Sequence, residues 1–215
     1  MEFDAVLIAS RKEKMLKEGY WLNKTIIDSL RQTIDKNPDK TALVGFKVED
    51  QTEQVFSYQD LWNMTNKIAL GLKQLGVAKN DVVSCQLPNW WEFTLLYLAC
   101  SRIGAVLNPL MPIFRERELE FMLKHGEAKV FIVPKRFRNF DHEQLANHLK
   151  TKIETLQHVV VVNGLEENNF DRVLVNHGLE QDSSAVTNLD QLEARPDDIT
   201  QLIFTSGTTG EPKGV

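Results

Sequence analysis

Hydroxyl, glycine and lysine residues gather in one short segment near the end of the 215-residue sequence. The apolar run Leu202-Ile203-Phe204-Thr205 leads directly into Ser206-Gly207-Thr208-Thr209-Gly210-Glu211-Pro212-Lys213-Gly214. Glycine lets a backbone approach an anion closely, hydroxyl and backbone N–H groups donate to its oxygens, and lysine adds a positive charge. The segment therefore predicts a phosphate-binding loop that follows a strand.

The spacing within this loop separates it from two other interpretations. The common nucleotide loop, Gly-x-x-x-x-Gly-Lys-Ser/Thr, would need glycine at Pro212 if it began at Gly207, which disfavours ordinary P-loop phosphotransferases. A polar linker is the usual meaning of such a composition. Because nine specified positions coincide by chance only on the order of once in a billion windows at average residue usage, we prefer the phosphate loop.

The segment from Thr205 to Gly214 resembles the signature of the acyl-adenylate-forming superfamily, which includes acyl-CoA synthetases and the adenylation domains of peptide synthetases. Less specific similarities extend over residues 20–215. They lie in Phe56-Ser57-Tyr58-Gln59-Asp60-Leu61, where the family usually has glutamate at Asp60, in Gln86-Leu87-Pro88-Asn89-Trp90-Trp91-Glu92-Phe93, and in Ser101-Arg102-Ile103-Gly104-Ala105-Val106-Leu107-Asn108-Pro109. The amino-acid sequence of residues 86–112 and 115–119 most resembles that of bacterial synthetases for short- to medium-chain or alicyclic acids.

The resemblance implies a two-step reaction. A carboxylic acid, fatty or alicyclic, reacts with ATP to give an acyl-adenylate and pyrophosphate, and coenzyme A then takes the acyl group as a thioester. Mg²⁺ and a cradle of donors would stabilise the departing pyrophosphate. The resemblance assigns contacts with the ATP phosphates to Thr205, Ser206, Gly207, Thr208, Thr209, Gly210 and Lys213, and a catalytic role to Lys213.

Later elements of the family pattern do not occur in this sequence. They are the glutamate that helps to place Mg²⁺, the ribose-binding aspartate, the hinge and the carboxyl-terminal lysine. We therefore expect a truncated portion of a longer enzyme that is inactive by itself. Residues 1–20 would form a charged helix or arm, and residues 21–215 the first part of the AMP-binding domain, without its carboxyl-terminal lid.

Two alternatives remain open at this stage. One is an adenylation domain that loads its acyl group onto a carrier protein, and the other is a nucleotide-binding module without chemistry. The sequence identifies neither the carboxylic acid nor an oligomeric state.

The composition narrows the class of protein. A net charge of −5 with 42% hydrophobic and 26% charged residues is typical of a soluble globular protein and disfavours nucleic acid as a partner. No secretion signal is evident at the start, and the two cysteines are interpreted as inert thiols in a reducing cytoplasm. The apolar segment Trp90–Cys100 contains Glu92 and is too short for a bilayer, so it predicts a core helix. Peripheral association with a membrane stays open.

The cysteines and histidines give no metal or redox spacing. Cys85 and Cys100 fall in apolar runs and are expected to be buried, inert thiols. The five histidines are scattered, without a second ligand at a suitable distance. We therefore predict no metal site formed by protein side chains alone.

Strand-like and helix-like segments alternate through the middle of the chain. Expected strands are 81–87, 105–107, 129–133 and 158–162, and expected helices are 90–102, 116–124 and 142–155. This alternation predicts an α/β fold with a mainly parallel sheet covered by helices on both faces. Such sheets bind ligands at the carboxyl ends of their strands, where the phosphate loop would also lie.

Helices and a hairpin are expected on either side of this pattern. The predicted segments are helices at 11–18, 24–36 and 57–75, a hairpin of strands 41–46 and 54–56, and a short element within 170–175 in an otherwise irregular connection at 163–198. Ser57 with Asp60 predicts a capping box, and Asn89 a helix cap. Trp90 and Trp91 are expected to anchor a helix rather than border a substrate entrance, and Asp197-Asp198 to cap a turn.

Overall fold

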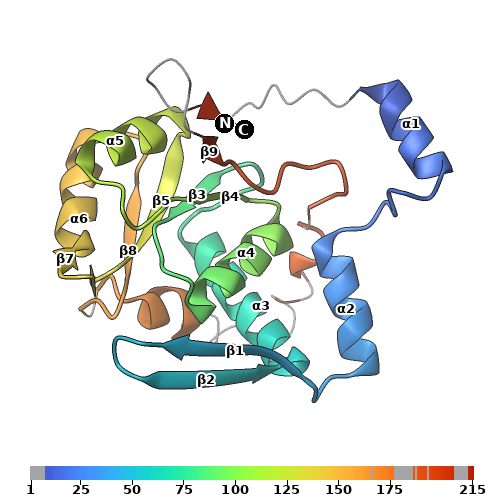
Figure 1. Cartoon of the computed structure of the whole chain (residues 1–215), viewed down its shortest axis with the longest axis horizontal. Coiled ribbons are helices and arrows are strands. Elements are labelled where there is room, and N and C mark those ends of the chain that lie inside the picture. Colours follow the sequence, from blue (N-terminus) through green and yellow to red (C-terminus); the bar gives the residue numbers. More distant parts are fainter. Residues whose placement is uncertain (1–7, 166, 177–185, 187, 193, 206–212) are drawn as a thin grey trace.

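The computed structural model describes residues 8–165, 167–176, 186, 188–192, 194–205 and 213–215. At the centre of this part lies a four-stranded parallel sheet with the order β4-β3-β5-β8 (Figure 1). Its strands are β3 (Val82–Cys85), β4 (Val106–Pro109), β5 (Ala128–Pro134) and β8 (His158–Val162). The expected α/β fold with a mainly parallel sheet is confirmed.

Alternate side chains of the sheet point into two separate hydrophobic clusters. In β5, Val130 and Ile132 belong to one cluster, and Phe131 and Val133 belong to the other. The helices that cover these faces are α3 (Tyr58–Gln74) and α4 (Trp91–Ile103) on one side, and α5 (Glu116–His125) and α6 (His142–Lys152) on the other (Figure 1). Because both faces are buried, the strands are almost continuously apolar, as expected for a parallel sheet.

Local signals in the sequence set where the long helices begin and end. Ser57 accepts a hydrogen bond from the Asp60 backbone N–H, and the Asp60 carboxylate accepts one from the Ser57 N–H, which confirms the capping box of α3. Gly76 after α3 and Gly104 after α4 have φ values of +76° and +67°. Glycine occupies this left-handed region without strain, so both helices stop where the sequence predicts.

The expectation that Asn89 caps α4 is wrong. Trp90 is the N-cap residue of this helix, with extended backbone angles and no side-chain capping bond. Trp90 is buried, its ring packs edge-on against Phe137 at a centroid distance of 6.1 Å, and its N–H donates to the Pro88 carbonyl. Burial of this large ring fixes the residue outside the helix, so α4 starts one residue later than a polar cap at Asn89 would place it.

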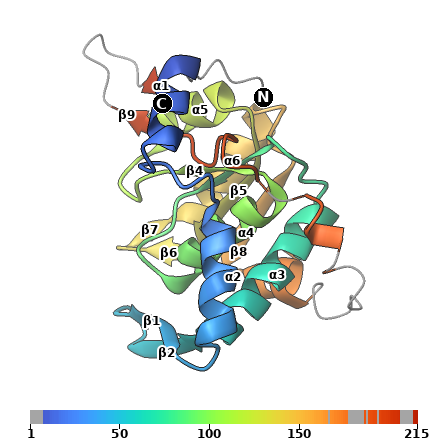
Figure 2. The ribbon, with the colours of Figure 1, turned by 90° about the vertical axis from the view of Figure 1, so that its right-hand side faces the viewer.

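The amino-terminal part of the chain begins with helix α1 (Ala9–Lys17). Helix α2 (Ile26–Lys36) and the antiparallel strands β1 (Thr41–Lys47) and β2 (Thr52–Ser57) follow, and these three elements contact α3 or α4. The helix α1 has no buried residue, as its charged sequence predicts. Figure 2 shows α2 alongside α3, with the β1–β2 hairpin at one end of the pair.

A second, smaller hairpin and a π-helix add to the predicted elements. Strands β6 (Arg136–Phe137) and β7 (Phe140–Asp141) pair antiparallel through a turn in which Arg138 and Asn139 have φ values of +48° and +61°. The sequence does not predict this hairpin, because its strands are only two residues long and non-glycine residues occupy the left-handed positions of its turn. The short element expected at 170–175 is a π-helix, η1 (Asp171–Asn176), packed on α3.

The contact between η1 and α3 requires a glycine. A Cβ atom at Gly71 would lie 2.5 Å from both the Cα atom and the carbonyl oxygen of Leu174. Backbone therefore approaches backbone directly at this position.

A buried arginine ties the segment before the phosphate loop to three helices. Arg102 is fully buried, donates from Nε to Asn66 at 3.1 Å and pairs with Asp190. Asp190 also pairs with Arg31 at 2.5 Å. The guanidinium groups of Arg102 and Arg31 lie 5.0 and 5.2 Å from the ring centroid of Trp62, within the range of a cation–π contact.

Within the part of the chain that the structure describes, no helix has the length and apolarity that a membrane crossing requires. The apolar segment Trp90–Cys100 lies mostly in α4, where Leu95, Leu96 and Ala99 are fully buried. The expectation of a core helix at this segment is confirmed.

Candidate functional site

The chain that leads to the predicted phosphate loop extends the central sheet. The N–H of Leu107 in β4 donates to the Thr200 carbonyl at 3.0 Å, and the Leu202 N–H donates to the Leu107 carbonyl at 3.0 Å. Gln201 thereby forms a parallel bridge with Leu107. Because this segment runs in the same direction as β4, the residues after Leu202 leave the sheet at its carboxyl edge, where α/β proteins bind ligands.

A small hairpin then brings the two ends of the predicted loop together. Strand β9 (Phe204–Thr205) pairs antiparallel with β10 (Lys213–Gly214), so that Thr205 lies opposite Lys213. Ile203 and Val215 extend this ladder with a reciprocal pair of backbone hydrogen bonds, each 2.8 Å long.

Two of the predicted phosphate contacts lie in this hairpin. Thr205 and Lys213 are exposed neighbours, and the Thr205 hydroxyl approaches the Lys213 carbonyl at 3.5 Å. The remaining predicted residues lie outside the described part of the chain: Ser206, Gly207, Thr208, Thr209 and Gly210. The hairpin thus places Thr205 and Lys213 of the predicted site opposite each other at the carboxyl edge of the sheet.

Buried polar groups connect three other loops at the same edge. Gln86 follows β3, and its Nε2 atom donates to the carbonyls of Met111 and Phe114 in the loop after β4, at 2.9 and 3.0 Å. Its Oε1 atom lies 2.9 Å from Nδ1 of His142, the first residue of α6. Gln86 therefore holds the loop after β4 and the start of α6 together.

This arrangement also sets the state of His142. Because both N–H bonds of Gln86 are used by carbonyls, its oxygen faces the ring and Nδ1 carries the proton. Burial opposes the charged form, and the positive charge of Arg115 adds to this effect, so the pKa of His142 is lowered to about 4 although Asp141 acts in the opposite direction. His142 is therefore neutral near pH 7. Sequence reasoning missed this role, since Gln86 and His142 are distant in the chain.

An ion pair is buried where the β1–β2 hairpin meets α4. Lys47 pairs with Glu92, and both side chains are almost fully buried. The Lys47 ammonium also lies 4.5 Å from the ring centroid of Trp90, and Trp91 packs against Phe56. Burial raises the pKa of Glu92, against the opposing effect of Lys47. These contacts favour the anchoring role expected of the two tryptophans.

The cysteines and the Asp197-Asp198 pair match their predicted structural roles. Cys85 and Cys100 are buried and free, and burial raises the pKa of both thiols, to about 12 for Cys85. Asp198 accepts a hydrogen bond from the Arg195 backbone N–H at 2.7 Å, which closes a turn, and it pairs with Lys79. No cluster of three metal-binding side chains occurs among the described residues.

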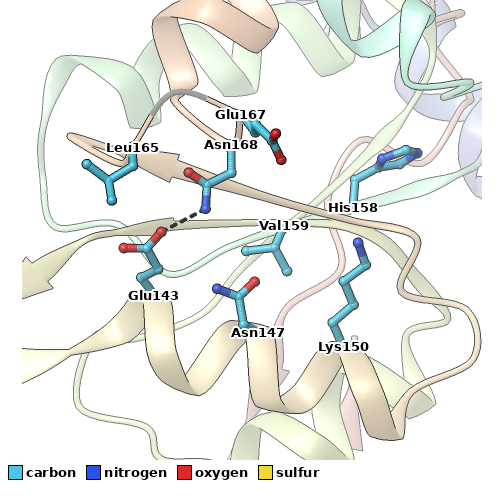
Figure 3. A pocket seen from close by; sticks show the side chains of 8 residues that line it. All are labelled: Glu143, Asn147, Lys150, His158, Val159, Leu165, Glu167 and Asn168. Atoms are coloured by element: carbon cyan, nitrogen blue, oxygen red, sulfur yellow. Dashed lines mark hydrogen bonds between the residues drawn. The ribbon is translucent and has the colours of Figure 1, made fainter.

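A groove of about 680 Å³ lies beside β8, the outer strand on the side of the sheet away from β4 (Figure 3). It is lined by Glu143, Asn147, Lys150, His158, Val159, Leu165, Glu167 and Asn168. A hydrogen bond of 2.7 Å from Asn168 to Glu143 spans it. None of the predicted phosphate contacts lines this groove.

Comparison with known proteins finds many related sequences and structures. The chain is 32% identical to the medium-chain fatty-acid–CoA ligase of Escherichia coli over 95% of its own length and 35% of that protein. It is 32% identical to the vibriobactin-specific 2,3-dihydroxybenzoate-AMP ligase of Vibrio cholerae, over 91% of this chain and 34% of that one. The chain therefore spans about a third of the length of the curated relatives that it matches.

Solved structures share the fold. The apo structure of MbtA from Mycobacterium smegmatis superposes with a TM-score of 0.81 at 24% identity, covering 97% of this chain and 36% of that one. A long-chain-fatty-acid–CoA ligase from Archaeoglobus fulgidus gives a TM-score of 0.71 at 25% identity, over 91% of this chain and 37% of that one.

The sequence profile of the family described as "AMP-binding enzyme" matches residues 30–215. Because this match covers most of the sequence, the chain belongs to the AMP-binding enzyme family.

Proposed function

We propose that the protein to which this chain belongs activates a carboxylic acid with ATP and transfers the acyl group to coenzyme A. The observation that carries the proposal is the β9–β10 hairpin. It places Thr205 opposite Lys213 at the carboxyl edge of the sheet, at the two ends of the hydroxyl- and glycine-rich segment. The family match over residues 30–215 supports the same function.

The first step converts the carboxylic acid, a poor electrophile, into a reactive acyl-adenylate. A carboxylate oxygen attacks the α-phosphorus of ATP, the bond from that phosphorus to the bridging oxygen breaks, and pyrophosphate leaves with the electron pair. Charge accumulates on the pyrophosphate, so donors held in advance around it lower the barrier. We assign these contacts to Thr205, Ser206, Gly207, Thr208, Thr209, Gly210 and Lys213.

Hydroxyl and ammonium groups suit phosphate oxygens, so the residues of the hairpin fit the triphosphate rather than a bare metal ion. We propose that Mg²⁺ accompanies the nucleotide and, when bound, neutralises charge on the departing phosphates. Lys213 then supplies the positive charge that the protein contributes to the same oxygens. In the second step the thiol of coenzyme A attacks the acyl carbonyl, and AMP leaves.

The acid is proposed to be fatty or alicyclic. The E. coli relative named for medium-chain fatty acids supports this class over almost the whole chain. A second candidate is transfer to a carrier protein instead of coenzyme A, because the V. cholerae relative is named as an AMP ligase without CoA. Adding coenzyme A to preformed acyl-adenylate on the enzyme separates the two: release of acyl-CoA supports the first, and its absence supports the second.

We also propose the domain division into an arm at residues 1–20 and the first part of the AMP-binding domain at residues 21–215. The cytoplasm is the proposed compartment. The buried free thiols of Cys85 and Cys100 support it, since reduced cysteines persist there.

The test is exchange of labelled pyrophosphate into ATP by the intact protein. Lys213→Ala and Thr209→Ala should each slow the exchange by about a hundred-fold, the effect of losing one donor from such a cradle. Lys124→Ala is the matched control, because Lys124 is an exposed lysine on α5 that pairs with Glu120. Exchange that stays at the wild-type rate in both loop variants would refute the proposed role of the hairpin.

A further inference from the structure

The hairpin that carries the predicted loop is too small to hold its own position. Each of its strands, β9 and β10, has two residues, and an isolated two-stranded hairpin is only marginally stable in water. The orientation of Thr205 and Lys213 must therefore depend on what the hairpin packs against.

The packing surface is the end of helix α5. Phe121 and His125 lie one turn apart on this helix, and their rings are stacked, with centroids 5.5 Å apart and planes inclined by 8°. The ring of Phe204 in β9 meets both of them at an angle, with centroid distances of 6.4 Å to Phe121 and 6.1 Å to His125. These are the separations and edge-on geometries that aromatic rings favour.

Two glycines show how closely the hairpin and the helix end fit. A Cβ atom at Gly126, directly after α5, would lie 3.1 Å from Cδ2 of Leu202. A Cβ atom at Gly214 in β10 would lie 3.1 Å from Cδ1 of the same leucine and 3.6 Å from the Phe204 ring. Leu202 is buried between them, so both strands of the hairpin are seated through one apolar contact region.

We propose that Phe121 and His125 are positioning residues for the adenylation step. They form an aromatic shelf, defined as the stacked rings of these two residues, on which Phe204 fixes the hairpin. The shelf acts through Phe204, which adjoins Thr205 and pairs with Gly214. This inference rests on the proposed function, because it assumes that the hairpin serves the ATP phosphates.

The proposed role of the shelf predicts different effects on the two half-reactions. Adenylation uses the phosphate cradle, whereas transfer of the acyl group from acyl-adenylate to coenzyme A takes place after pyrophosphate has left. A hairpin that is displaced by a fraction of an ångström should therefore impair the first half-reaction and spare the second. Misplacement of about 1 Å costs on the order of a hundred-fold in rate.

The experiment measures both half-reactions in the intact protein, for His125→Ala, His125→Phe and Phe121→Leu. We expect pyrophosphate exchange to fall about ten- to a hundred-fold in His125→Ala and Phe121→Leu. Thioester formation from supplied acyl-adenylate should stay at the wild-type rate. His125→Phe keeps an aromatic ring in the stack and should restore exchange. His125 is exposed, so its replacement leaves the core intact.

His148→Ala is the matched control, an exposed histidine on α6 that contacts Glu116 at the other end of α5. Wild-type exchange in His125→Ala and Phe121→Leu, together with slow exchange in Lys213→Ala, would refute the shelf and leave the proposed function standing. Equal losses in both half-reactions would show a general structural effect and also overturn the proposal. Failure of His125→Phe to restore exchange would do the same, because the imidazole itself would then be required.

Discussion

Acidification should destabilise the protein through His142, and replacing this residue with glutamine should remove that effect. The pKa of His142 is lowered from 6.5 to about 4, mainly because the ring is buried. As the pH falls, the unfolded chain therefore binds a proton before the folded chain does. The contribution of the neutral ring to stability is fully present above about pH 6.5 and is lost as the pH falls towards 4.

The size of the effect follows from the two pKa values. One pKa unit corresponds to about 1.4 kcal/mol, so the full difference between 6.5 and about 4 amounts to roughly 3 kcal/mol in the free energy of unfolding. Between about pH 7.5 and about pH 5 the expected loss is about 2 kcal/mol, since most of the unfolded chains but few of the folded ones are protonated at the lower value.

The measurement is urea-induced unfolding of the wild type and His142→Gln across this pH range. Every other titrating group is common to both proteins, so the change with pH in their stability difference isolates His142. Arg115 and Asp141, the charges acting on the ring, are also unchanged. His148→Gln is the control, because this histidine is exposed on α6.

Parallel stability curves for the wild type and His142→Gln would refute this reasoning. They would mean that the ring has the same proton affinity in the folded and unfolded chain, and that the burial of His142 beside Gln86 does not hold it neutral. A stability difference that grows in favour of the wild type on acidification would contradict the sign of the shift.

Two further predictions concern contacts that thermal or urea unfolding can measure. Glu92→Ala leaves Lys47 buried without its partner and should lower the free energy of unfolding by about 3–5 kcal/mol. The double replacement of Lys47→Met with Glu92→Leu should lower it by less than the single replacement does. A larger loss in the double variant would contradict this prediction. Gly71→Ala should destabilise by about 1–3 kcal/mol because its Cβ meets the backbone of Leu174, and a gain in stability, as helix propensity alone predicts, would show that the contact is absent.

The sheet and its helices could be predicted because their signals are local. Apolar runs define β5 and β8 within one or two residues, and Ser57 with Asp60 defines the start of α3. The β6–β7 hairpin escaped prediction, since strands of two residues show no periodicity. The cap of α4 was misplaced because burial of Trp90 overrides the preference of Asn89 for the cap position.

In the candidate site, too, some features depend on neighbouring residues in the sequence and others on contacts between distant residues. The phosphate loop stays a prediction from its own residues, and the structure adds that Thr205 and Lys213 are cross-strand neighbours. The aromatic shelf and the pair of Gln86 and His142 could not be predicted, because they join residues that are far apart in the chain. No spacing in a single sequence shows which distant rings or amides will meet.

The anchoring of Asp190 by Arg102 and Arg31 separates the route between β8 and the hairpin into two independent stretches. The approach of the chain to the hairpin is thus held at Asp190, and a shift of the residues on one side of this point reaches the other side only if the two ion pairs break.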